Sequence, residues 1–200
     1  LYYCTDAREQ LNLYRHDTVE GESAQLTEYA QPVFSAAVSP DGERVAYVTN
    51  ESENLENRDV YVADADGSNP RNLGIGEEGF EASVSDWSEG GELLVSDNTP
   101  DLTRTGIYDL ESDEVEWFGP GECEESPVAF LPDGRGYVVL RTREAATMPI
   151  IYDREGSERQ LDLPEGVASP PGYDEPFLED STVLLSHTTS NERSELLAYD

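Results

Sequence analysis

The stretch Ser39-Pro40-Asp41-Gly42-Glu43-Arg44-Val45-Ala46-Tyr47-Val48 joins a tight turn to an apolar run. Pro40 fixes φ for the first corner of a type I turn, Asp41 accepts hydrogen bonds from the nearby backbone, and Gly42 adopts the positive φ at which the chain reverses. The apolar residues from Val45 to Val48 predict a short strand directly after the turn. We therefore expect a β-hairpin here.

The same turn recurs along the chain. Leu131-Pro132-Asp133-Gly134 repeats it in full, whereas Ser88-Glu89-Gly90-Gly91 and Leu178-Glu179-Asp180-Ser181 repeat it with substitutions. The four turns begin at positions 39, 88, 131 and 178, so they are 49, 43 and 47 residues apart. A period of this length is typical of repeat architectures.

A second marker has the same period. Five short apolar stretches each end in an aspartate, and the intervals between these aspartates are 47, 45, 44 and 47 residues. The aspartates are Asp17, Asp64, Asp109, Asp153 and Asp200. Two markers with one period indicate a structural repeat.

The clearest repeat holds four short strands and no stretch with helical periodicity. The expected strands are Val33–Val38, Arg44–Thr49, Asp59–Asp64 and Arg71–Leu73. Four antiparallel strands repeated every forty-odd residues are typical of a β-propeller, in which each repeat is one blade. The fold class is therefore predicted to be all-β.

The two markers divide the chain into five repeats. We expect a single β-propeller domain or fragment of about four to five four-stranded blades, with the first and last blades incomplete. Both ends of the sequence fall in strand-like residues, which favours a fragment. The predicted repeats span residues 1–30, 31–76, 77–121, 122–166 and 167–200.

The composition is strongly acidic. Forty-four acidic residues oppose twelve basic ones, the net charge is -32, and all twelve basic residues are arginine. Such a charge excludes binding to nucleic-acid backbones or to anionic membrane surfaces, because both need a basic footprint. The acids are interleaved with strand-like runs, so they belong to a folded surface. The absence of lysine favours a halophilic source, where salt screens self-repulsion.

Two parts of the second repeat together resemble the TolB-type propeller repeat. They are Val38-Ser39-Pro40-Asp41-Gly42-Glu43-Arg44-Val45-Ala46-Tyr47-Val48 and the residues from Arg58 to Leu73. This type of repeat also forms the amino-terminal domain of prolyl oligopeptidase and acylaminoacyl-peptidase relatives. The resemblance extends with uneven strength over most of the chain, and it is specific for the propeller type rather than for an activity.

In those peptidases the propeller stands before an α/β-hydrolase domain that holds the catalytic serine, aspartate and histidine. This sequence contains no Gly-x-Ser-x-Gly elbow, so no catalytic residue is assigned to it and the implied catalytic domain lies beyond Asp200. The resemblance then implies a gating propeller that admits short peptide substrates in a cytoplasmic serine peptidase, with the hydrolase domain as its partner in cis. The alternative is a non-catalytic TolB-like propeller that binds another protein as a scaffold.

Half of the arginines lie in, or next to, the connection between the second and third strands of their repeats. Propeller symmetry brings equivalent connections to one face, which predicts a rim that binds peptide carboxylates or docks a partner, since guanidinium groups bind carboxylates bidentately. The alternative is local pairing with Asp6, Glu9, Asp59, Asp101, Glu144 or Glu195. The six arginines are Arg8, Arg58, Arg104, Arg141, Arg143 and Arg193.

Other polar motifs are interpreted structurally. Asp64-Ala65-Asp66-Gly67-Ser68-Asn69 is expected to be a turn, because its glycine is fourth rather than sixth as a calcium loop requires. The acid pairs Glu77-Glu78 and Glu124-Glu125 are expected on a solvated surface. His16 and His187 lack ligands at metal spacing, so we expect neither a metal nor a cofactor.

The cysteines and aromatic side chains are expected to fill the core. Cys4 and Cys123 are interpreted as small packing residues, with a disulfide between them as the less favoured alternative. Trp87, Trp117 and the eleven tyrosines are expected to pack between blades.

The charge predicts that the folded state depends on salt. Raising KCl from about 0.1 M to about 3 M shortens the Debye length from about 10 Å to below about 3 Å. We expect Tm to rise by roughly 10 °C, equivalent to about 3–5 kcal/mol for a chain of this length. Thermal unfolding followed by circular dichroism measures this. A monomeric, cooperative transition with the same Tm at both salt concentrations would contradict the prediction.

Overall fold

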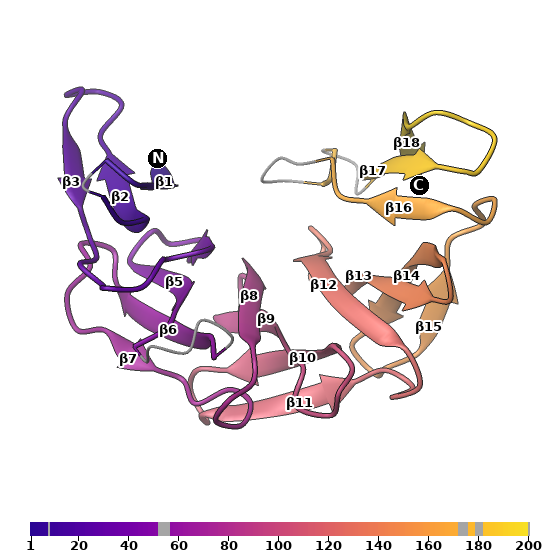
Figure 1. The fold of residues 1–200 in the computed structure, drawn as a ribbon, viewed down its shortest axis with the longest axis horizontal. Coiled ribbons are helices and arrows are strands. Elements are labelled where there is room, and N and C mark those ends of the chain that lie inside the picture. The colour runs from indigo at the N-terminus through magenta and orange to yellow at the C-terminus, as the bar shows by residue number, and fades with distance from the viewer. Residues whose placement is uncertain (8, 52–56, 172–175, 179–181, 200) are drawn as a thin grey trace. The chain divides into compact units, whose positions relative to one another are not determined.

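The computed structural model of the protein describes residues 1–7, 9–51, 57–171, 176–178 and 182–199 (Figure 1). Every regular element in these ranges is a β-strand, which confirms the predicted all-β class. The chain forms two compact units. The first consists of Leu1–Thr99 and Ile107–Val115, and the second of Pro100–Gly106 and Glu116–Asp200.

The first unit begins with two antiparallel sheets whose strands follow chain order. The three-stranded sheet contains β1 (Tyr2–Thr5), β2 (Asn12–His16) and β3 (Ser23–Gln25). The four-stranded sheet contains β4 (Ala36–Val38), β5 (Arg44–Thr49), β6 (Asp59–Asp64) and β7 (Arg71–Asn72).

The strand boundaries in this four-stranded sheet lie close to those predicted. The strands Arg44–Thr49 and Asp59–Asp64 are confirmed at both ends. The first strand begins at Ala36 rather than at Val33, because Val33 donates its backbone N–H to the Leu11 carbonyl in the preceding sheet, at 2.8 Å.

The next sheet has the same sequential order and supplies residues to both units. It contains β8 (Ala82–Trp87), β9 (Glu92–Asp97), β10 (Arg104–Asp109) and β11 (Glu114–Phe118).

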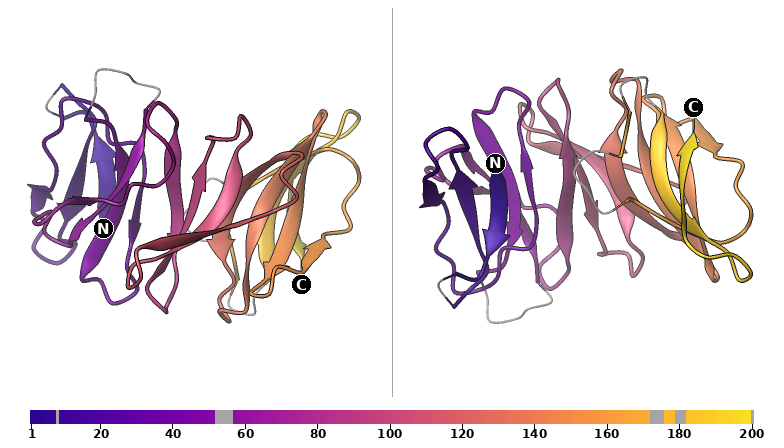
Figure 2. Two further views of the ribbon diagram at one scale, coloured as in Figure 1. Left: turned by 90° about the horizontal axis from the view of Figure 1, so that it is seen from below. Right: turned by 90° about the horizontal axis from the view of Figure 1, so that it is seen from above.

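The second unit continues with β12 (Glu124–Phe130), β13 (Gly136–Arg143), β14 (Ala146–Asp153) and β15 (Glu158–Gln160). Three further strands follow in the same hydrogen-bonded sheet, and Figure 2 shows them from two sides. They are β16 (Val167–Ser169), β17 (Val183–Thr188) and β18 (Glu195–Tyr199). Only one parallel pair, Thr147 with Val167, joins the two groups among the described residues. Within the described residues, the predicted repeats thus hold three, four, four, four and three strands, while their assignment to one domain stays a prediction.

In each unit, neighbouring groups of strands bury apolar side chains in a shared cluster. In the first unit Leu13, Val45 and Tyr47 pack in one cluster. In the second, Val138 and Leu185 belong to another. Alternate residues of a strand face opposite sides, yet the central strands β5 and β9 are buried along nearly their whole length, so both faces of these sheets are covered.

The turn at Ser39 forms as predicted. Gly42 has φ of +72° and donates its N–H to the Ser39 carbonyl at 2.8 Å. The Ser39 hydroxyl donates to the Asp41 carboxylate at 2.6 Å, and this hydrogen bond lowers the pKa of Asp41. The Ser39 N–H donates to the carbonyl of Arg44 at 3.0 Å, which closes the hairpin.

Two other turns have the same backbone pattern. Gly91 donates to Ser88 at 3.0 Å and Gly134 donates to Leu131 at 2.8 Å, with φ of +87° and +70° at the two glycines. The turn at Ser88 is therefore equivalent although it has lost the proline. The fourth predicted turn includes residues 179–181, which lie outside the described residues.

The strand-ending aspartates cap the turns that follow them. Asp17 accepts hydrogen bonds from the N–H groups of Val19 and Glu20, at 2.8 and 3.0 Å. Asp109 and Asp153 accept equivalent bonds from residues two positions ahead, at 2.8 and 3.0 Å. Backbone N–H donors lower the pKa of all three carboxyl groups, and for Asp153 the main one is the N–H of Ser157, at 2.8 Å. At these three positions the second sequence marker recurs because an Asx turn needs this side chain. Asp64 instead accepts hydrogen bonds from the side chains of Ser68 and Asn69, and Asp200 lies outside the described residues.

Candidate binding site

Glu125 is buried, and its predicted place on a solvated surface is wrong. Its side chain is 2% exposed, although Glu124 beside it is exposed. The Glu125 N–H donates to the Thr103 carbonyl at 2.8 Å, and the Thr105 hydroxyl donates to the Glu125 carbonyl at 3.0 Å. These two hydrogen bonds hold the backbone of Glu125 in place and so position its carboxylate.

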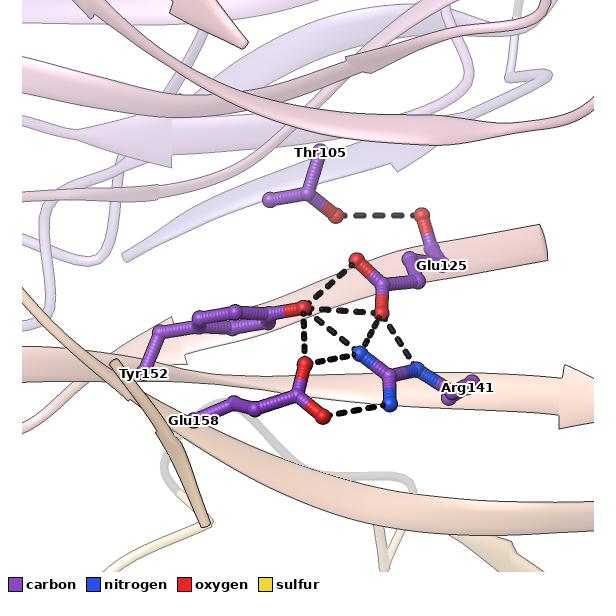
Figure 3. A network of polar contacts seen from close by, with 5 residues as sticks. All are labelled: Thr105, Glu125, Arg141, Tyr152 and Glu158. Carbon is purple, nitrogen blue, oxygen red and sulfur yellow. Dashed lines mark hydrogen bonds and ion pairs between the residues drawn. The ribbon is translucent and has the colours of Figure 1, made fainter. Parts of the chain in front are cut away.

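Arg141 neutralises this buried carboxylate from the neighbouring strand. Its Nε donates to Glu125 Oε1 at 2.6 Å, and the Tyr152 hydroxyl donates to the same oxygen at 3.0 Å (Figure 3). Glu125 and Arg141 are directly opposite in the β12–β13 register. A buried charge is tolerated only when it is paired and hydrogen-bonded, and both conditions hold here.

Glu158 completes the network on the more exposed side of Arg141. The guanidinium donates to both Glu158 oxygens, from Nη1 at 3.0 Å and from Nη2 at 2.5 Å. This bidentate contact lowers the pKa of Glu158 and raises that of Arg141, and burial raises the pKa of Tyr152. The guanidinium of Arg141 thus binds two carboxylates. With Tyr152, these side chains connect the four strands β12, β13, β14 and β15.

Gly119 leaves the space that the carboxylate occupies. A Cβ at this position would stand 2.2 Å from Glu125 Oε2, and the backbone has φ of +96°. Both the space and the dihedral angle require glycine. The loop after β11 therefore forms part of the site.

A cavity of about 250 Å³ lies beside this loop within the second unit. The Arg104 guanidinium stacks over the Trp117 ring, with 4.0 Å between its Cζ and the ring centroid. Apolar side chains and the thiol of Cys123 form much of the remaining wall. The lining residues are Pro100, Leu102, Thr103, Arg104, Trp117, Phe118, Gly119, Gly121, Cys123 and Glu125.

A second cavity of about 300 Å³ lies in the same unit and is more polar. Arg141 and Arg143 line it from β13, and Glu144 and Glu165 add negative charge. Arg143 is exposed, in contrast to Arg141. The two cavities together involve three of the six predicted rim arginines.

The structure places the other predicted arginines separately. Arg58, in the first unit, stacks over Phe34 at 4.2 Å and pairs with Glu81 at 3.4 Å. Arg193 is exposed just before β18, and Arg8 lies outside the described residues. Arg58 pairs with Glu81, just before β8, and Arg141 pairs with Glu125 in β12 and Glu158 in β15. None of these acids is among the six that the local alternative named. The carboxylate-binding rim stays a prediction.

The remaining sequence candidates have local roles. The stretch from Asp64 to Asn69 forms the predicted turn, in which Asp64 accepts hydrogen bonds from Ser68 and Asn69 at 3.1 and 2.6 Å. The rings of His16 and His187 contact Ser23 Oγ and the Pro164 carbonyl, at 2.9 and 3.1 Å.

Both cysteines are free thiols. Trp87 is buried in the core of the first unit, while Trp117 is half-buried at the cavity wall. In the ranges that the structure describes, no three His, Cys, Asp or Glu side chains converge as a metal site would require. No helix in those ranges is long and apolar enough to cross a membrane.

Comparison with solved structures shows the fold. The chain is 19% identical to TolB from Acinetobacter baumannii, with a TM-score of 0.72, covering 95% of this chain and 46% of that one. It is 16% identical to a putative TolB from Agrobacterium tumefaciens, with a TM-score of 0.75, covering 98% and 73%. It is 19% identical to a puromycin-hydrolysing peptidase from Mycobacterium tuberculosis, with a TM-score of 0.76, covering 100% and 33%.

The chain therefore has the predicted TolB-like β-propeller fold, of which it forms a part. It spans less than half the length of the first TolB and one third of the peptidase. No family model and no curated protein matches its sequence.

The network predicts a sharp difference between two arginines on one strand. Arg141→Met leaves the Glu125 carboxylate buried without its cation, and we expect a loss of about 3–5 kcal/mol in the free energy of unfolding. Arg143→Met, two residues away and exposed, should change it by less than about 0.5 kcal/mol. Urea unfolding of both variants in high salt measures the difference. Equal effects would contradict the assigned role of Arg141.

Proposed function

We propose that the chain is the gating propeller of a prolyl oligopeptidase-type serine peptidase, whose catalytic α/β-hydrolase domain lies outside this sequence. The supporting observation is the full coverage of this chain by one third of a peptidase. A prolyl endopeptidase is matched in the same way, over 99% of this chain and 30% of its own. The remainder of such a protein holds the catalytic machinery.

The chemistry of the chain is consistent with access control rather than catalysis. The turns and buried charges of the chain stabilise its sheets. A propeller built in this way can exclude large polypeptides from an active site by steric hindrance alone. In the proposed protein, the propeller lets only short peptides reach a separate active site. In this proposal the hydrolase domain is its partner in cis, and the protein is cytoplasmic and comes from a halophile. The acidic, lysine-free composition supports the halophilic source.

A TolB-like scaffold is the second candidate, because the two TolB matches have TM-scores of 0.72 and 0.75, close to the 0.76 of the peptidase match. In that case the propeller binds another protein and no hydrolase domain follows. The two candidates share the fold and differ in what the rest of the protein contains.

Labelling of the complete protein with a fluorophosphonate probe for serine hydrolases separates them. We expect covalent labelling in high salt, together with cleavage of a short proline-containing peptide but not of an unfolded protein carrying the same sequence. The heat-denatured protein is the control for non-specific labelling. A folded protein that takes up no probe would overturn the peptidase proposal, and equal cleavage of both substrates would overturn the gating role.

A further inference from the structure

We propose that the 300 Å³ cavity beside Arg143 binds a small zwitterion, which carries one ammonium group and one carboxylate as a free amino acid does. Arg143 binds the carboxylate, and Glu144 and Glu165 bind the ammonium group. This site goes beyond the proposed function and does not depend on it, because all of its residues belong to this chain and it needs no hydrolase domain.

Three charged side chains in the wall of this cavity are available to a ligand. Arg143, Glu144 and Glu165 are exposed, and no hydrogen bond or ion pair joins their side chains to a residue that the structure describes. Arg141 also lines the cavity, but it is already bound to its two partner acids. The described wall therefore presents one cation and two anions that have no partner within it.

Hydrogen bonds hold the backbone around Glu165 next to the β13–β14 hairpin. The Gly166 carbonyl accepts the N–H of Thr147, in β14, at 2.9 Å. On the other side of Glu165, His187 Nε2 donates to the Pro164 carbonyl at 3.1 Å. The two walls of the cavity are thus positioned before a ligand arrives, which reduces the entropy that is lost on binding.

The mixture of charges selects a zwitterion over a simple anion or cation. An anion that binds Arg143 is repelled by Glu144 and Glu165, and a cation that binds these acids is repelled by Arg143. A zwitterion satisfies both signs, since a guanidinium binds a carboxylate bidentately and carboxylates accept hydrogen bonds from an ammonium group. The net charge of -32 also repels anions over long distances, but it does not repel a molecule without net charge.

The other charges near the cavity strengthen binding of the ammonium group. Arg141 and its two partner acids together carry one negative charge. Glu122 is a further acid in this neighbourhood, because its charge and that of Arg143 both act on the Cys123 thiol, whose pKa is raised mainly by burial. Arg143 is therefore the side chain that decides whether a carboxylate is accepted.

The size and the remaining wall of the cavity limit the ligand. A volume of about 300 Å³ lies at the lower end of the range for drug-sized molecules, about 300–1,000 Å³. Ala146 and Met148 add apolar surface, which suits an apolar side chain. A single apolar amino acid and a dipeptide share this size and charge pattern, and the experiment below distinguishes them.

Calorimetric titration of the complete protein in high salt tests the charge pattern. The protein is first treated with the fluorophosphonate, so that a hydrolase active site does not contribute. Leucine and leucyl-leucine are the probes, and a dipeptide that binds at least as tightly as leucine identifies peptides as the ligands. The amide, which lacks the carboxylate, and the acetyl derivative, which lacks the ammonium group, should each bind at least about tenfold more weakly than the better probe.

Matched variants locate the binding in this cavity. Arg143→Gln and Glu165→Gln should each weaken binding of the better probe by about tenfold or more. Arg193→Gln and Glu124→Gln, which change exposed residues of the same unit outside the cavity wall, should leave it unchanged. Unchanged binding by Arg143→Gln would overturn the proposal. Equal binding of a probe and either of its derivatives, or no binding of either probe, would also overturn it without relying on a variant that fails to fold.

Discussion

The carboxylate of Glu125 introduces a negative charge at a position where its side chain is 2% exposed. An isolated charge there would cost several kcal/mol, so the surrounding strands must supply a cation and hydrogen-bond donors together. Arg141 comes from β13, Tyr152 from β14 and Glu158 from β15, while Gly119 leaves the necessary space. The relative positions of these four strands are therefore tied to one side chain, and the cavity next to it depends on that arrangement.

Local chemistry made much of the fold predictable. The turn at Ser39 and the strand-ending aspartates act within five residues of themselves, so their sequence patterns identify their structures directly. The two central strands of the second repeat were predicted to the residue for this reason. The Ser88 turn could be placed without its proline because all three described turns share a glycine with positive φ, which is Gly91 in this turn.

The candidate site could not be predicted in the same way, because it depends on strand register. The turn at Leu131 pairs Phe130 with Tyr137, and an unbroken register from there would place Glu125 opposite Thr142. A shift between Pro127 and Ala129 instead brings Glu125 opposite Arg141. Such an irregularity moves a side chain by one position along its partner strand. Pro127 is the one sequence signal for it, because proline within a strand occurs at edges or bulges, but a proline alone does not give the new register. The acid pair was consequently assigned to the surface.

The arginines link the fold to the proposed activities. They were predicted to form a common rim, yet the described ones have different environments: Arg58 and Arg104 stack on aromatic rings, Arg141 is in the buried network and Arg143 is exposed. Stacking and bidentate pairing both exploit the planar guanidinium, which explains why lysine would not replace arginine at these positions. Arg104 stacks on Trp117 in the wall of the 250 Å³ cavity.

A double-mutant cycle between Glu125 and Arg141 tests most directly whether one buried charge organises the second unit. The free energy of unfolding would be measured for Glu125→Gln, Arg141→Met and the double variant in the same high-salt buffer. The account predicts that the double variant is less destabilised than the sum of the single variants, by at least about 1 kcal/mol, because removing both charges leaves none buried alone. Additive effects would show that the two side chains act independently, and would contradict the account.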